Sequence, residues 1–392
     1  MSDQTGWRPP QYGAAPAWAP PPKPGLVPLR PLTFGQLLGT PFQVLRRNTG
    51  ALFGAAVLIQ VLVVIGSLLV VGSATGWFLY RAAHATDADR DAIEAGGVAA
   101  VIVAALVAVA FSVIASGVLQ GIVVIDVANG VLGYRPRAGQ LWHATRGRRW
   151  ALAGFVFLVG AALLVGVAVL AGIVAALVIP GAASGGGGGA ALIAVGVIVG
   201  LLCGAGFAVL WAWLWGKTSL AASAIMLERL GIRAAIARSW RLTRGGFWRV
   251  FGAQVLVIAI CWVATQIVST PISLIFQFAL QAAFPTGTPS SFTGVDASSL
   301  TIAGISYGVL LLFTLVIGAV TSVIQSATGV IVYVDQRMRR EGLDLVLTRY
   351  VEDRQLGRPL GDPFATPRFA EQRAQQAPQP PQQQAPQPPG AW

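Results

Sequence analysis

Residues 151–179 read ALAGFVFLVGAALLVGVAVLAGIVAALVI and contain no polar side chain. A helix needs about 20 apolar residues to cross a hydrocarbon core that is roughly 30 Å thick. Because that core holds no water to bond the backbone, a segment of this length and composition forms a transmembrane α-helix. The stretch therefore places the chain among integral membrane proteins.

Five further segments have the same character, at about 51–72, 98–120, 190–215, 250–270 and 300–322. Of the 392 residues, 55% are hydrophobic and 11% charged, whereas about a quarter are charged in soluble proteins. The strands of a membrane β-barrel would be shorter and alternating. The predicted fold is an all-α integral membrane helical bundle with about six transmembrane helices. Residues 1–30 lack the apolar core of a signal peptide, so we expect an uncleaved first span.

The basic residues lie on one side of this predicted membrane. Residues 1–50, 129–149, 217–249 and 335–373 hold 25 of the 27 Lys and Arg. Short cytoplasmic loops are rich in Lys and Arg, so this distribution predicts that both termini are cytoplasmic. Charge spread over several membrane-proximal loops suits anionic lipid headgroups as partners, and we expect no nucleic-acid binding. The use of Arg with only two lysines, together with many Ala, Gly and Val, indicates a GC-rich bacterial genome, so the membrane we expect is the bacterial cell membrane.

The basic segments share a plan that recurs about every 100 residues. They lead into membrane spans as RRNTGALFG (46–54), RGRRWALAG (146–154) and RGGFWRVFG (244–252). An acid follows each second span, at Asp126, Glu228 and Asp335. We therefore predict three repeats of an interfacial helix plus a helical hairpin, at about 31–130, 131–230 and 231–345.

Two of the predicted interfacial helices have clear signals. Thr33 and Gln36 have the spacing of a capping box at the start of the first. The third is amphipathic, with one basic and one apolar face made by Arg233, Arg238, Arg241 and Arg244 opposite Ile232, Ile236 and Trp240. Such a helix lies in the membrane surface or packs on the cytosolic ends of the bundle, and the pattern leaves both open.

The three repeated acids predict a first candidate site. A carboxylate at the C-terminal end of a helix faces the negative end of the helix dipole and needs a cation nearby. We expect a ring of acid–arginine contacts on the cytosolic face, which is structural or binds lipid headgroups. The candidate residues are Asp126, Glu228, Asp335, Arg146, Arg149, Arg238, Arg241, Arg244 and Arg249. Further arginines at this depth are Arg46, Arg47, Arg148, Arg229 and Arg337.

Polar groups inside the spans predict a second candidate, an intramembrane polar site with Lys217 and Gln325. Lys217 follows three tryptophans and is either an interfacial anchor that reaches water or a charge inside the bilayer, where charges are usually functional. Five glutamines lie in or beside spans, either bonding helices together or lining a polar path. They are Gln60, Gln120, Gln254, Gln266 and Gln325.

The two ends of the chain have a different composition. Residues 1–30 are rich in Pro, and 351–392 are rich in Pro and Gln. Neither composition can build a core, so we expect disordered cytosolic tails around a membrane domain at 31–350. Pro-rich segments also dock in aromatic grooves, which leaves a protein partner open.

Three segments together resemble the glycerophosphoryl diester phosphodiesterase membrane-domain family: PLRPLTFGQLLGTPFQVLRRN (28–48), LERLGIRAAIARSWRLTRGGFWRVFG (227–252) and IVYVDQRMRREGLDL (331–345). The chain is similar in particular to stand-alone actinobacterial members with Pro-rich ends. This resemblance covers about residues 28–350 and implies a membrane architecture with a loose link to glycerophospholipid metabolism. It does not imply hydrolysis, because a catalytic barrel needs about 250 residues of alternating strands and helices, and no soluble segment is that long.

We therefore expect a non-catalytic accessory or scaffold protein in bacterial envelope or glycerophospholipid physiology. We expect no catalytic residue, cofactor or metal, because the only histidines are His84 and His143, on opposite predicted sides of the membrane. The alternative is a transporter, or a lipid or small-molecule permease, with a site between the repeats. A membrane-embedded phosphodiesterase is a weaker alternative, because the titratable residues are scattered.

Overall fold

The computed structural model describes residues 25–86, 89–184, 186–283, 297–359 and 361–365. These residues form eleven α-helices and no strand. Six of the helices are long and apolar enough to cross a membrane. The predicted all-α membrane bundle is therefore confirmed.

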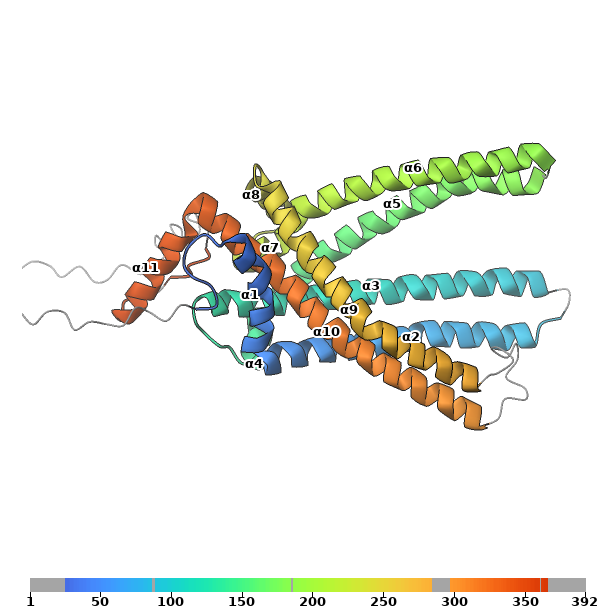
Figure 1. Cartoon of the computed structure of the whole chain (residues 1–392), viewed down its shortest axis with the longest axis horizontal. Helices are drawn as coiled ribbons and strands as arrows, with labels where there is room; N and C mark the ends of the chain where they lie inside the picture. Colours follow the sequence, from blue (N-terminus) through green and yellow to red (C-terminus); the bar gives the residue numbers. More distant parts are fainter. Residues whose placement is uncertain (1–24, 87–88, 185, 284–296, 360, 366–392) are drawn as a thin grey trace, which may run out of the picture.

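The six long helices pair as three hairpins that extend in one general direction from a common base (Figure 1). The hairpins are α2 (Thr49–Ala83) with α3 (Arg90–Val131), α5 (Arg149–Ser184) with α6 (Gly186–Thr218), and α9 (Phe247–Ala283) with α10 (Ala297–Glu341). The acids that follow the second spans lie differently in the three hairpins. Asp126 and Asp335 lie within α3 and α10, whereas α6 ends at Thr218 and a short helix continues to Leu227, just before Glu228.

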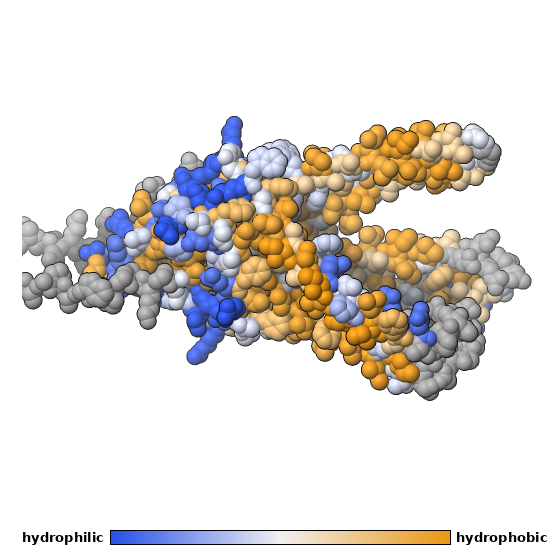
Figure 2. Space-filling view, in the orientation of Figure 1, coloured by the Kyte–Doolittle hydropathy of each residue, from blue (hydrophilic) through white to orange (hydrophobic). Residues whose placement is uncertain are grey.

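The remaining helices gather at the base, where Figure 2 shows the hydrophilic surface. They are α1 (Phe34–Arg47), α4 (Ala138–Ala144), α7 (Ala221–Leu227), α8 (Ile232–Thr243) and α11 (Leu343–Gln355). The predicted capping box of α1 is present, with Gln36 N donating to Thr33 Oγ1 at 3.3 Å. Helices α1, α4 and α8 each precede a hairpin, in the places predicted for the interfacial helices. The equivalence of the three units stays a prediction.

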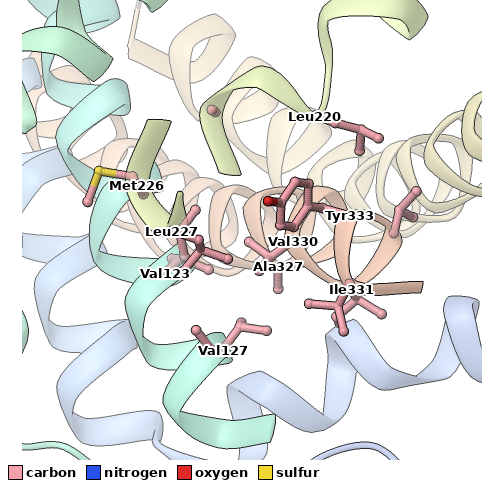
Figure 3. Close-up of a cluster of buried hydrophobic side chains, with 14 of the residues drawn as sticks. Val123, Val127, Leu220, Met226, Leu227, Ala327, Val330, Ile331 and Tyr333 are labelled. Carbon is pink, nitrogen blue, oxygen red and sulfur yellow. The ribbon is translucent and has the colours of Figure 1, made fainter. Parts of the chain in front are cut away.

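The buried core lies where the hairpins meet the base. Leu52, Leu152 and Val250 occupy matching places near the starts of α2, α5 and α9, and all three are fully buried. Figure 3 shows the centre of this cluster, where Val123 and Val127 of α3 face Ile331 and neighbouring side chains of α10. The hydrophobic effect acts only at this junction, because apolar side chains farther along the arms have lipid around them.

The α5–α6 hairpin diverges from the other two, and a wide gap separates its outer part from them in Figure 2. None of the residues in the most hydrophobic stretch of α5 is buried. Glycines bring α5 and α6 together: a Cβ on Gly196 or Gly200 would lie 2.8 Å from a valine methyl of α5. Small residues of this kind allow close helix contact in membranes. The two helices of the α5–α6 hairpin therefore pack closely against each other, and the hairpin contacts the rest of the bundle near its inner end.

The boundaries predicted for the two tails are wrong by several residues. Val27 is 1% exposed in the core, and Leu26 N donates to the Gly130 carbonyl at 2.9 Å. Helix α11 reaches Gln355, and the buried Phe364 accepts from Arg337 at 3.0 Å. Apolar side chains in both segments cover the base, which explains why they are ordered against it. Residues 1–24 and 366–392, with the predicted Pro-rich docking segments, lie outside the described residues.

Candidate functional site

The first candidate site lies at the base, where Asp126, Glu228 and Asp335 are all buried. Asp335 of α10 accepts the Leu32 backbone N–H at 2.9 Å, Arg249 Nε at 3.2 Å and Arg339 Nε at 3.1 Å. Both arginines also donate to the Leu32 carbonyl, each at 2.6 Å. The carboxylate therefore ties the start of the third hairpin to the segment before α1.

Glu228, which follows α7, lies in a larger network. It accepts Arg238 Nε at 2.9 Å and the hydroxyl of the fully buried Tyr333, and Arg337 Nε lies 3.6 Å away. Glu341 accepts from the same two arginines, at 2.7 Å and 2.9 Å. Burial by itself lowers the pKa of Arg238. The hydrogen bonds and negative charges of Glu228 and Glu341 outweigh this effect and raise the pKa above the ordinary arginine value. These charge-assisted bonds join α8 to α10.

The predicted acid–arginine contact is wrong for Asp126. Among the described residues, no basic nitrogen lies within 4.0 Å of its carboxylate, which accepts the Asn48 amide at 2.7 Å. The nearby Arg47 donates to the carbonyl of Tyr134 instead. Burial lowers the pKa of Arg47, and the charge of Asp126 partly opposes this. A neutral amide thus occupies the place where an ion pair was expected.

The predicted ring is also not continuous. Arg146, Arg149, Arg241 and Arg244 form no ion pair within the described chain. The Arg149 guanidinium lies 5.6 Å from the centre of the Trp142 ring. In the part of the chain that the structure describes, these arginines therefore have no acidic partner, and a role in binding headgroups stays a prediction.

The sequence patterns did not identify Arg339, Glu341 or Tyr333 as members of this network. Asp335–Arg339 and Arg337–Glu341 are ion pairs one helical turn apart in α10, and their spacing was a usable signal. Tyr333 carries no comparable signal, because its partner comes from a different part of the chain, 105 residues away. The network could be found only once α7 and α10 were placed side by side.

The second candidate site is a cavity of about 320 Å³ where the three hairpins converge. Helices α3, α5, α6, α7, α9 and α10 contribute to its wall. No charged side chain lines it, but many hydroxyl and amide groups do. The polar lining residues are Ser116, Gln120, Thr218, Ser219, Gln254, Ser322, Gln325, Ser326 and Thr328.

The amides in this cavity differ in their hydrogen bonding. Gln254 donates to Ser219 Oγ at 3.0 Å. Gln120 and Gln325 form no hydrogen bond with any described residue, although both lie in membrane-spanning helices. Gln325 is exposed and Gln120 half-buried, so both amides are open to the space between the hairpins. In an apolar surrounding an unpaired amide costs several kcal/mol, so both amides would favour a bound polar group to which they can donate and from which they can accept.

Lys217 does not share this cavity, although its neighbour Thr218 does. Its ammonium lies 5.4 Å from the centre of the Phe247 ring and 6.0 Å from that of Trp240. The prediction that Lys217 and Gln325 belong to one intramembrane site is therefore wrong, because only Gln325 lines the cavity. The flat aromatic faces hold the cation at the start of α9, away from the cavity.

No protein-family model, curated protein or solved structure matches the chain. The resemblance to the glycerophosphoryl diester phosphodiesterase membrane-domain family therefore stays a prediction. Within the described residues, no three His, Cys, Asp or Glu are grouped as metal ligands would be.

Proposed function

We propose that this is a non-catalytic, multi-pass protein of the bacterial cell membrane that binds a lipid-like amphiphile between its hairpins. The amphiphile has an uncharged, hydrogen-bonding head, which the cavity receives. The carrying observation is the pair of unbonded amides, Gln120 and Gln325, in a cavity within the membrane-spanning helices. This role adopts the permease-like alternative and retains the expected link to glycerophospholipid physiology.

The position of the cavity supports a ligand that arrives from the bilayer. Its wall includes Phe155, Val156 and Val159 of α5 and Ser116 of α3, so it lies where the α5–α6 hairpin begins to diverge. Apolar side chains beyond this point are exposed along both hairpins. An amphiphile could place its chains between the hairpins and its head in the cavity, since each part would then meet a matching surface.

The chemistry of the lining supports binding rather than catalysis. General acid–base or nucleophilic catalysis needs clustered titratable groups, and the cavity wall has none. The hydroxyls of Ser116, Ser219 and Thr328 donate to backbone carbonyls within their own segments, at 2.8–3.0 Å. The oxygens of Ser116 and Thr328 remain able to accept a hydrogen bond from a ligand, and Ser219, which already accepts from Gln254, keeps one lone pair. A hydroxyl-bearing neutral glycerolipid such as diacylglycerol has the matching head.

The test uses the full chain with Gln120→Leu and Gln325→Leu together, and Gln266→Leu as a matched control. Gln266 is exposed on α9 and does not line the cavity. We expect diacylglycerol to raise the melting temperature of the parent protein and the control in detergent, and to raise that of the double variant much less. Native mass spectrometry should show the same order of lipid retention. An equal response in all three proteins, or none in the parent, would refute the proposed site.

The orientation is part of the same proposal: the basic base faces the cytoplasm. The one-sided charge distribution supports it. Reporter fusions at positions 90, 185 and 290 should be external, and those at both termini cytoplasmic. A cytoplasmic signal at any of the three internal positions would remove a hairpin from the proposed topology.

A scaffold role is the second candidate. It is favoured by the exposed Arg146, Arg241 and Arg244 at the base, which have no acidic partner in the described chain. Such arginines attract anionic lipid headgroups by about 1 kcal/mol each. Retention of a protein partner without any lipid response at the cavity would favour this role.

A further inference from the structure

A groove of about 420 Å³ runs between the start of α2 and α4, apart from the cavity described above. Its floor is the α2 face from Gly50 to Leu58, roughly 12 Å long at 1.5 Å per residue. Leu141, Trp142 and His143 of α4 form the opposite wall. Most of the lining is apolar, and the groove lies at the boundary between the basic base and the membrane span.

Glycines keep this groove open. Gly50 and Gly54 of α2 and Gly139 of α4 all line it, and a Cβ added to any of them would meet no atom within 4 Å. The space is therefore large enough for a further apolar group.

The other two hairpins have side chains of interfacial helices near the corresponding place, although Gly252 of α9, like Gly54 of α2, faces open space. Beside α5, a Cβ on Gly154 would lie 3.6 Å from Ile232 Cδ1 of α8. Beside α9, Leu38 and Phe42 of α1 pack against a buried cluster that includes Val257. At α2, α4 leaves a groove of about 420 Å³.

The sequence of α4 explains the difference from α8. A buried threonine, followed by Arg and a left-handed glycine, caps α4 at Thr145 and is the last residue of α8 at Thr243; the glycines are Gly147 with φ 86° and Gly245 with φ 81°. Aligned on this Thr-Arg-Gly turn, the counterpart of Ile232 is Tyr134, which precedes α4, and the counterpart of Ile236 is the smaller Ala138. Helix α4 therefore begins too late to place a side chain where Ile232 lies, and it lacks the apolar side chain of Ile236 that packs against the core.

We infer that this groove binds one acyl chain of an anionic phospholipid from the leaflet on the basic side of the protein. The charges beside the groove support this occupant. The Arg149 guanidinium lies over Trp142, a residue of the groove wall, and pairs with no acid in the described chain. Arg146 follows α4, is exposed, and is equally unpaired in that part of the chain. Guanidinium groups bind phosphate by charge-assisted hydrogen bonds, so a chain in the groove would bring its phosphate to these arginines.

The experiment uses the full chain in nanodiscs with a phosphatidylglycerol that carries a photoreactive diazirine on one acyl chain. We expect crosslinks on peptides that contain residues 50–59 and 138–143. Gly54→Leu should lower this crosslinking by about tenfold, because the new side chain occupies the groove and displaces several methylenes. Gly252→Leu is the matched control: it lies at the corresponding place in α9, its Cβ would also meet no atom within 4 Å, and it does not line the groove.

The charge component is tested separately. Arg149→Gln should reduce crosslinking by phosphatidylglycerol and leave crosslinking by a matched phosphatidylcholine unchanged. Equal crosslinking by both lipids in the parent protein would overturn the anionic specificity. Equal loss in Gly54→Leu and Gly252→Leu would overturn the groove itself. The groove could also give no lipid crosslinks while Gly54→Leu converts an oligomer to a monomer. That result would show that a second copy of the chain occupies the groove, and it would likewise overturn the inference. Diacylglycerol binding at the cavity is measured independently, so either proposal can fail alone.

Discussion

The first and third hairpins both bury a carboxylate at the base, but they stabilise it in different ways. Asp335 accepts two guanidinium groups and a backbone N–H, whereas Asp126 accepts a neutral amide from Asn48. Glu228, between them in the sequence, resembles Asp335 because it also pairs with arginines. The three acids occupy corresponding positions in the sequence, but the interactions that stabilise their charges differ.

The difference follows from what each hairpin touches. The base of α10 contacts α8, α9 and the segment before α1, and all of these contribute arginines or backbone groups to its network. Removing one member of a buried ion pair is costly because it leaves the other charge without compensation. We therefore expect the three acids to contribute unequally to stability, in the order Glu228, Asp335 and Asp126.

The largest effect is expected for Glu228→Gln. This change leaves two arginines, Arg238 and Arg337, with 13% and 5% exposed side chains and one remaining acid, Glu341. We expect a loss of about 3 kcal/mol, at the lower end for broken buried pairs because Glu341 remains. The measurement is the melting temperature and folded yield in detergent. Glu352→Gln, on the exposed surface of α11, is the control.

The pairing can be checked by exchanging the charges. Glu228→Arg alone should lower the folded yield, and adding Arg238→Glu should restore part of it. If Glu228→Gln is as stable as the Glu352→Gln control, the network does not stabilise the base.

A smaller effect is expected for Asp335→Asn. Its partners Arg249 and Arg339 have 30% and 35% exposed side chains, so water can solvate them once the charge is lost. We expect a loss of about 2 kcal/mol, as for a hydrogen bond to a charged group. The Leu32 segment should also loosen, which faster amide hydrogen exchange in the peptide that contains Leu32 would report. Unchanged exchange together with unchanged melting would show that Asp335 does not hold this segment.

The smallest effect is expected for Asp126→Asn. The substituted amide retains an oxygen that can accept from Asn48, and no ion pair with a described residue is lost. We expect a change below about 1 kcal/mol in the free energy of unfolding, again from the melting temperature in detergent. A loss as large as that of Asp335→Asn would mean that Arg47 pairs with Asp126 in the membrane, and would remove the contrast between the hairpins.

The sequence by itself determined the features that depend on local composition. Six apolar segments of sufficient length predict six spanning helices, because transfer of a helix into hydrocarbon depends on its own residues. The capping box at Thr33 and Gln36 was equally predictable, since both partners lie within one turn.

Only the tertiary structure decided which helices meet and what lies between them. Leu32 and Asp335 are 303 residues apart, and Gln120 and Gln325 come from different hairpins, so no local pattern joins either pair. In lipid, the outward and inward faces of a spanning helix are both apolar, so the pattern that identifies the buried face of a soluble helix is lost. The number of spans follows from composition, whereas the ion-pair network, the cavity and the groove follow from packing that composition does not encode.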